Sequence, residues 1–280
     1  MKTKITADST CDLSAQLVEK YDIRIVPLQI VMAGKPYKDG LEITPKEIFQ
    51  YVESGKGICQ TTAVNVEEYA EVFRQELSRY DAVVHLNIGS GFSACYQNAC
   101  IAAEEFQNVY VVDSKNLSTG MGHLVLDAAL MAQSGAEPEK IKDAMDEAAG
   151  KLEASFVINS LKYLHKGGRC SAVAALGANL LQLKPCIEVI DGKMDVGKKY
   201  RGSFEKVIRQ YVEDRLKDRT DIDDKRIFIT STCSDRQLLD TVKALVVGFV
   251  EFKEVIETFA GCTVSNHCGP DTLGILFYRK

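Results

Sequence analysis

A histidine near the C-terminus is the first candidate for chemistry. His267 lies between Cys262 and Cys268, just before a Gly-Pro pair that begins an apolar run. A histidine can bind a metal, act as a general base, or donate a hydrogen bond to an anion. The two cysteines stand farther apart than the C-x₂-C pattern of a closed tetrahedral zinc site. We therefore expect no metal ion here.

The other three histidines have no neighbours with metal-ligand spacing. His85 falls in a predicted strand, His123 at the predicted start of a helix, and His165 in a predicted loop. A histidine in such a setting is usually a structural residue, and we expect that role for all three.

Ser93 is the second candidate. The segment Gly91-Phe92-Ser93-Ala94-Cys95 nearly matches the G-x-S-x-G nucleophile elbow, between a predicted strand and a predicted helix, and His267 follows in the order of the α/β hydrolases. However, Cys95 replaces the second glycine, and no acid partner for His267 is identifiable. Ser93 at a helix N-terminus could instead bind an anion. Two alternatives stay open: a serine esterase or lipase-like hydrolase using Ser93 and His267, and an anion-binding protein.

Ser93 and His267 can act together only if the predicted strands and helices around them bring their loops close to each other. In the first half, short apolar segments alternate with amphipathic ones. Strands are predicted at 3–7, 23–32, 81–88 and 109–113, and helices at 14–21, 45–52, 66–80 and 93–106. Pro27 marks an edge or a bend in its strand, and capping boxes begin the second and third helices. This alternation predicts a mostly parallel sheet flanked by helices, a Rossmann-like α/β domain over residues 1–155.

Small polar residues gather in four predicted loops. They occupy the loops 7–10, 60–65, 88–95 and 112–120. In doubly wound sheets, ligands bind beyond the carboxyl ends of the strands, where such loops converge. The sequence therefore predicts a binding site among these loops.

The second half has a different pattern. A strand near 155–160 leads to a hairpin at 187–196, in which Asp191-Gly192 suits a type I′ turn. A helix at 204–217, a strand at 226–231, a helix at 235–249 and strands at 253–259 and 272–278 follow. We predict an α+β domain with an antiparallel or mixed sheet over residues 156–280.

Composition limits the function classes. The chain has 280 residues, 46% hydrophobic content and a net charge of -5, so it lacks the basic excess that nucleic-acid binding requires. Its longest apolar run, 244–250, is too short for an integral membrane segment, and its first residues do not form a secretory signal. Nine cysteines without CxxC pairs suit reduced thiols. We therefore expect a cytoplasmic globular protein.

Seven segments together resemble a known family. They are ADSTCDL, QTTAVN, IGSGFSACYQNA, VVDSKNLSTG, LKYLHKGGR, LKPCIEVIDGKM and HCGPDTLGILF, in this order along essentially the whole chain. They resemble the DegV family of bacterial fatty-acid-binding proteins. The family pattern reads T-S-Q-P-S where this chain has residues 61–65, and S-G-T where it has residues 93–95. The hydroxyl groups at positions 61, 62 and 93 are kept.

The resemblance implies a binding protein rather than an enzyme, with no cofactor. Such proteins hold one long-chain fatty acid in an apolar tunnel between two domains, with its carboxylate at the mouth, and present it to a separate fatty-acid kinase for acyl-phosphate formation. The carboxylate ligands carried over by position are Thr61, Thr62, Ser93, Arg201 and His267. A partly desolvated carboxylate needs charge-assisted donors, which hydroxyl, guanidinium and imidazole groups provide. The role of Arg169 stays open.

Overall fold

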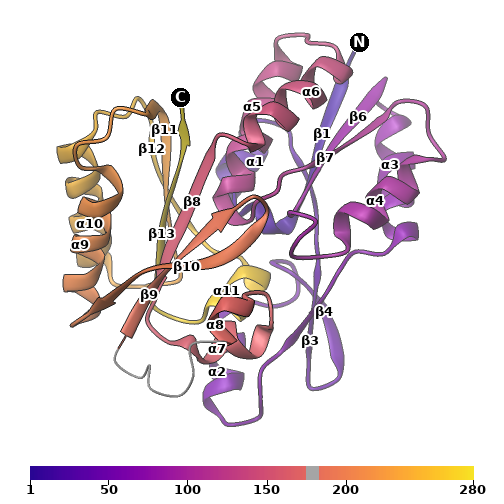
Figure 1. The fold of residues 1–280 in the computed structure, drawn as a ribbon. Helices are drawn as coiled ribbons and strands as arrows, with labels where there is room; N and C mark the ends of the chain where they lie inside the picture. The colour runs from indigo at the N-terminus through magenta and orange to yellow at the C-terminus, as the bar shows by residue number, and fades with distance from the viewer. Residues whose placement is uncertain (175–182) are drawn as a thin grey trace.

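The computed structural model describes residues 1–174 and 183–280, and its first large sheet is parallel throughout. The strand order is β2-β1-β6-β7 (Figure 1). These strands are β1 (Thr3–Asp8), β2 (Arg24–Val26), β6 (Ala82–Asn87) and β7 (Val109–Asp113). The residues of β1 and β6 are buried throughout, as expected for strands covered on both faces.

Helices cover both faces of this sheet, as the alternation of strand and helix predicts. α3 (Val66–Leu77) and α4 (Cys95–Ala103) lie on one side, and α1 (Ala15–Lys20), α5 (Ser118–Gln133) and α6 (Pro138–Ala149) on the other (Figure 1). The predicted capping box of α3 is present, because the Asn65 and Glu68 side chains each accept from the other residue's backbone N–H. A second box, of Thr44 and Glu47, begins α2 (Pro45–Glu53).

The segment 23–32 forms two strands rather than one. β2 ends at Val26, and β3 (Gln29–Met32) joins a separate antiparallel sheet of order β4-β3-β5. Pro27 lies between them, and a proline cannot donate a ladder hydrogen bond, so the chain leaves the first sheet there. The sequence did not predict this small sheet, whose other strands are β4 (Lys35–Lys38) and β5 (Gln60–Thr62).

The second large sheet is mixed, as predicted, with the order β10-β9-β8-β13-β11-β12. Only β11 and β12 are parallel neighbours. The strands are β8 (Leu152–Ile158), β9 (Leu183–Ile190), β10 (Lys193–Arg201), β11 (Ile222–Ser231), β12 (Val255–Phe259) and β13 (Thr272–Arg279). Asp191 and Gly192 join β9 to β10 with φ values of 48° and 74°, which confirms a turn with two positive φ angles.

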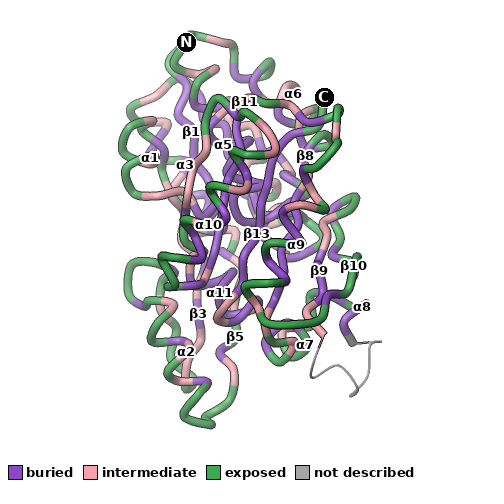
Figure 2. Tube along the Cα trace, turned by 90° about the vertical axis from the view of Figure 1, so that its left-hand side faces the viewer, coloured by how far each residue is buried: buried purple, intermediate pink, exposed green. Residues whose placement is uncertain are grey.

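Helices on the two faces of this second sheet have different partners. α9 (Phe204–Leu216) and α10 (Arg236–Phe249) form an outer layer over their own hydrophobic core. α5 packs against the inner face, and it is buried along most of its length because it lies between the two large sheets (Figures 1 and 2). The His123 Nε2 atom lies 2.9 Å from the Leu276 carbonyl oxygen, and burial lowers the pKa of His123 to about 3. α5 therefore joins the sheets.

Two short helices replace predicted loops. α7 (Leu161–Gly167) contains His165, and α11 (Cys262–Cys268) contains His267. α8 (Ser171–Ala174) follows α7. His123 lies inside α5 rather than at its start, and β6 contains His85 as expected.

The change from one large sheet to the other comes after α6 ends at Ala149 and before β8 begins at Leu152. Residue 155, the predicted boundary, lies inside β8. The division into domains 1–155 and 156–280 stays a prediction.

Candidate binding site

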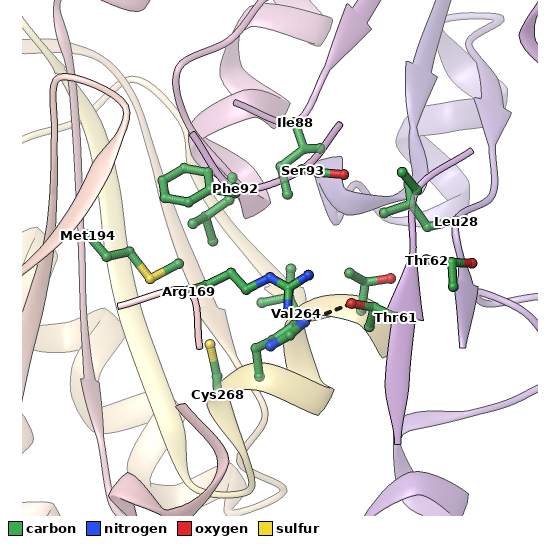
Figure 3. A pocket seen from close by; sticks show the side chains of 14 residues that line it. Leu28, Thr61, Thr62, Ile88, Phe92, Ser93, Arg169, Met194, Val264 and Cys268 are labelled. Carbon is green, nitrogen blue, oxygen red and sulfur yellow. Dashed lines mark hydrogen bonds between the residues drawn. The ribbon is translucent and has the colours of Figure 1, made fainter. Parts of the chain in front are cut away.

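A cavity lies where the first sheet, the small sheet and α11 meet (Figure 3). With its open mouth it encloses about 530 Å³. Its lining includes four of the five predicted ligand residues. The lining residues are Leu28, Thr61, Thr62, Ala63, Ile88, Phe92, Ser93, Leu117, Arg169, Met194, Thr263, Val264, His267 and Cys268.

The polar and apolar side chains of this lining lie at different depths. Thr62 and Arg169 are exposed, and Thr61 and Ser93 are half-buried. Leu117 and Val264 are buried. The cavity therefore has a polar, solvent-exposed mouth and an apolar interior.

His267 is held in the mouth by Thr61. The His267 Nε2 and Thr61 Oγ1 atoms are 2.9 Å apart, across the dashed line in Figure 3. Burial, with a smaller contribution from the positive charge of Arg169, lowers the pKa of His267 to about 4. The imidazole is therefore neutral at pH 7. Its Nδ1 atom is buried and has no hydrogen-bond partner among the described residues.

The two glycines after α7 have separate roles. Gly168 caps the helix with a φ of 67°, which favours glycine. Gly167 lies against His267, because a Cβ atom added there would stand 2.3 Å from His267 Nδ1. The segment Lys166-Gly167-Gly168-Arg169 thus holds the imidazole on one side and brings Arg169 to the mouth.

Ser93 is paired locally. The first helical residue of α4 is Cys95 rather than Ser93, and Ala94 is the N-cap residue. The Ser93 hydroxyl accepts from the Cys95 backbone N–H at 3.3 Å and donates to Cys95 Sγ at 3.1 Å. Because His267 pairs with Thr61, these contacts do not form the serine–histidine pair that a hydrolase uses.

A buried carboxylate fixes the neighbouring strand ends. Asp8, at the end of β1, accepts hydrogen bonds from the Tyr69 hydroxyl at 2.7 Å and from the Ile88 backbone N–H at 2.9 Å. It also accepts from Asn87 Nδ2 at 3.1 Å. These bonds tie β1 to the end of β6, from which the loop to Ser93 starts. Asp8 therefore supports the site.

Arg201 does not line the cavity. It is the last residue of β10, where its Cα pairs with that of Leu183, and it is exposed. The guanidinium group in the lining belongs to Arg169, whose Nη1 donates to the Gly167 carbonyl oxygen at 2.8 Å. In the sequence, Arg169 stands out only because it directly follows the pair Gly167-Gly168, which indicates a turn. That pattern does not show that the turn packs against His267.

A second cavity, of about 400 Å³, adjoins the first. Leu117, Val264 and Cys268 line both cavities, and we call these three residues the passage. The remaining lining of the second cavity is Ser118, Ala154, Phe156, Val189, Thr230, Ser231, Thr232, Ala260, Thr272, Gly274 and Leu276. Each hydroxyl in this set is hydrogen-bonded within the protein. An apolar space therefore continues inward between α5, α11 and the second sheet.

Neither a membrane-spanning helix nor a metal-binding cluster occurs within residues 1–174 and 183–280. No helix in these ranges combines the length and apolar character needed to cross a bilayer. Within the same ranges, no group of three or more His, Cys, Asp or Glu side chains could hold a metal ion.

Comparison with known proteins identifies the class to which this two-sheet fold and divided cavity belong. Residues 2–280 match the family model described as "Uncharacterised protein, DegV family", and the chain belongs to the DegV family. A DegV domain-containing protein of Caldanaerobacter subterraneus subsp. tengcongensis is 33% identical over 281 residues, covering 100% of this chain and 99% of the relative.

Similar proteins with described ligands include one known by sequence and two solved structures. A protein of Thermotoga maritima named fatty acid-binding protein is 28% identical over 282 residues, covering 98% of this chain and 96% of the relative. The structure of a fatty-acid-binding DegV family protein from Thermus thermophilus is 29% identical, with a TM-score of 0.90 and 100% coverage of both chains. A stearic acid-binding protein from Eubacterium ventriosum is 28% identical, with a TM-score of 0.83, covering 99% of this chain and 98% of the other.

We expect Gly167→Ala to displace the His267 ring, because the new methyl group would meet Nδ1. In the native protein an NMR titration should show His267 titrating near pH 4 instead of 6.5. As the pH falls, the unfolded state protonates His267 at a higher pH than the folded state does. The stabilisation from the neutral, buried His267 is therefore present above pH 6.5 and is lost as the pH falls toward 4. In the variant the pKa should rise toward 6.5 as the ring gains solvent.

Gly150→Ala is the matched control for this substitution. Its added Cβ would lie 3.5 Å from the Glu147 carbonyl oxygen, an ordinary contact, so His267 should titrate as in the native protein. An unchanged His267 titration in Gly167→Ala would contradict the contact.

Proposed function

We propose that this protein binds one long-chain fatty acid and presents its carboxylate to a separate fatty-acid kinase, which forms the acyl phosphate. The carboxylate lies at the mouth of the first cavity, and the acyl chain runs through the passage into the second. The main support is the arrangement of two adjoining cavities, in which exposed or half-buried polar side chains line the mouth of the first and the lining of the second is mostly apolar with internally hydrogen-bonded hydroxyls. The similarity to proteins described as binding fatty acids, stearic acid among them, supports the same ligand class.

The mouth offers a carboxylate several donors. The hydroxyl groups of Thr61, Thr62 and Ser93 come from the first part of the chain. Arg169 and His267 come from the second part and add a permanent cation and a neutral imidazole. A hydrogen bond to a charged group contributes about 1.5–3 kcal/mol, so several together can offset the partial desolvation of the carboxylate.

The cations suit the phosphorylated product as well. An acyl phosphate carries more negative charge than the carboxylate and carries it farther from the acyl chain. Arg169 is exposed at the mouth, and Arg201 is exposed at the end of β10. We assign Arg169 to the carboxylate in place of the predicted Arg201, and Arg201 to the side that the kinase approaches. The transfer itself belongs to the kinase, in the cytoplasm.

The ligand can be identified by solvent extraction of the purified protein. We expect mass spectrometry to find one long-chain fatty acid per chain. Val264→Asp should remove it, because a carboxylate in the passage would have to be buried. Val247→Asp is the control, since Val247 is 54% exposed on α10. A folded native protein that neither carries nor takes up a fatty acid would exclude the proposal.

The kinase step should separate the two arginines and His267 from the hydroxyl groups. With kinase and ATP added, we expect Arg169→Ala, Arg201→Ala and His267→Ala to retain fatty acid but give little acyl phosphate. Ser93→Ala and Thr62→Ala should lower fatty-acid occupancy more than the Arg169, Arg201 and His267 variants do. Lys198→Ala, which loses an exposed ion pair with Asp214, should change neither quantity. Native turnover in the Arg169 and His267 variants would exclude them from the head-group site.

A further inference from the structure

The N-terminal end of α11 has no local cap. Its N-cap residue is Gly261, which has no side chain to accept a hydrogen bond. Two carboxylates from the start of the chain accept from this end instead. Asp12 Oδ1 accepts from the Gly261 backbone N–H at 2.8 Å, and Asp39 accepts from those of Cys262 at 2.8 Å and Thr263 at 3.1 Å. In these three hydrogen bonds the donor and acceptor residues are 223 to 249 positions apart in the sequence.

Asp12 also holds the start of α5. The Ser118 hydroxyl donates to Asp12 Oδ2 at 2.5 Å, and Ser118 is the first residue of α5. One buried side chain thus joins the N-terminal ends of α5 and α11. A Cβ atom on Gly261 would lie 3.0 Å from Asp12 Oδ1, so the absence of a side chain there permits the approach.

Two of the three passage residues lie at these helix ends. Leu117 precedes α5 directly, and Val264 lies in the first turn of α11. Both residues line both cavities. Asp12, which bridges the two helix ends, therefore lies next to the segments that place two of the three passage residues.

We infer that Asp12 is a positioning residue that sets the width of this passage and so controls retention of the acyl chain. The inference rests on the proposed function. It assigns Asp12 no contact with the ligand. Asp39 accepts from α11 and from Ser9, whereas Asp12 accepts from both α11 and the start of α5.

The protonation state of Asp12 is part of this arrangement. Burial, with a smaller contribution from Asp39, raises the pKa of Asp12 to about 8, so Asp12 is protonated at neutral pH. Raising the pH places a second negative charge beside Asp39 in a buried site.

The other titratable groups facing Asp12 are three thiols. Cys11 lies beside it in the chain, and Cys262 and Cys268 face it from α11. Burial raises the pKa of Cys11 and Cys268 to about 12, and that of Cys262 is also raised. These thiols stay protonated while Asp12 titrates.

The test compares a long ligand with a short one. Palmitate must pass Leu117 and Val264, whereas octanoate can lie in the first cavity. By isothermal titration calorimetry at pH 7, Asp12→Ala, which loses the hydrogen bonds to both helix ends, should weaken palmitate binding by about tenfold and leave octanoate binding unchanged. Asp12→Asn keeps the acceptor for Gly261 and mimics the neutral carboxyl group, so it should bind both as the native protein does.

A pH profile gives an independent readout. As the pH rises through about 8, palmitate affinity should fall in the native protein relative to Asp12→Asn, which has no proton to lose at this position. Comparing the two proteins cancels the titration of the ligand. Should Asp12→Ala fail to fold, this profile decides alone.

Asp235→Ala is the control for loss of a carboxylate cap. Asp235 accepts from the Leu238 backbone N–H at 3.1 Å, at the start of α10 and outside both cavity linings, so both affinities should persist. Equal weakening of octanoate and palmitate in Asp12→Ala would overturn the inference, as would superimposable pH profiles. If the native protein binds neither ligand, the proposed function fails instead.

Discussion

The position of α11 depends on hydrogen bonds from the opposite end of the chain. A helix of this length has little stability of its own, because its first and last turns leave most backbone groups without partners. Asp12 and Asp39 supply acceptors at its start, and the Gly269 carbonyl oxygen accepts from Thr232 just after its end. Since α11 carries both His267 and the inner wall of the cavity, these contacts place the mouth and the passage together.

The acyl chain and the carboxylate of a fatty acid contribute differently to its binding free energy. Burying a methylene group contributes about 0.8 kcal/mol, so a dozen methylenes contribute about 10 kcal/mol before the costs of ordering the chain. A hydrogen bond to the carboxylate contributes about 1.5–3 kcal/mol. In the proposed complex the acyl chain would therefore dominate affinity, and the polar mouth would fix the direction in which the ligand lies. A neutral His267 suits this division, because it can donate a hydrogen bond without a permanently buried charge.

Local sequence patterns predicted the elements whose causes are local. The capping boxes at Thr44 and Asn65 depend on residues three positions apart, and the Asp191-Gly192 turn depends on two adjacent residues. Strand and helix alternation predicted the first large sheet, and the hairpin and strands of the second half predicted the second. Ser93 was found because it follows a predicted strand, and Thr61 and Thr62 were found through the family resemblance. The structure places all three in one lining.

Features that depend on distant residues were missed. α11 was not predicted because the carboxylates that cap it lie in other segments, and Gly261 gives no capping signal. The sequence analysis named Arg201 as a ligand and left the role of Arg169 open, because only the folded structure shows that Arg169 lines the cavity. The loop 7–10 looked like part of a binding site, but its Asp8 is buried in a hydrogen-bond network that ties strand ends together.

A crystal structure with a terminally brominated long-chain fatty acid would test the central claim most directly, because the anomalous signal of bromine locates the end of the acyl chain. We predict a bromine peak in the second cavity, beside Phe156 and Leu276, with the carboxylate near Thr62 and Arg169. A peak at the mouth of the first cavity, with the carboxylate inside, would contradict the account. So would a ligand that lies outside both cavities.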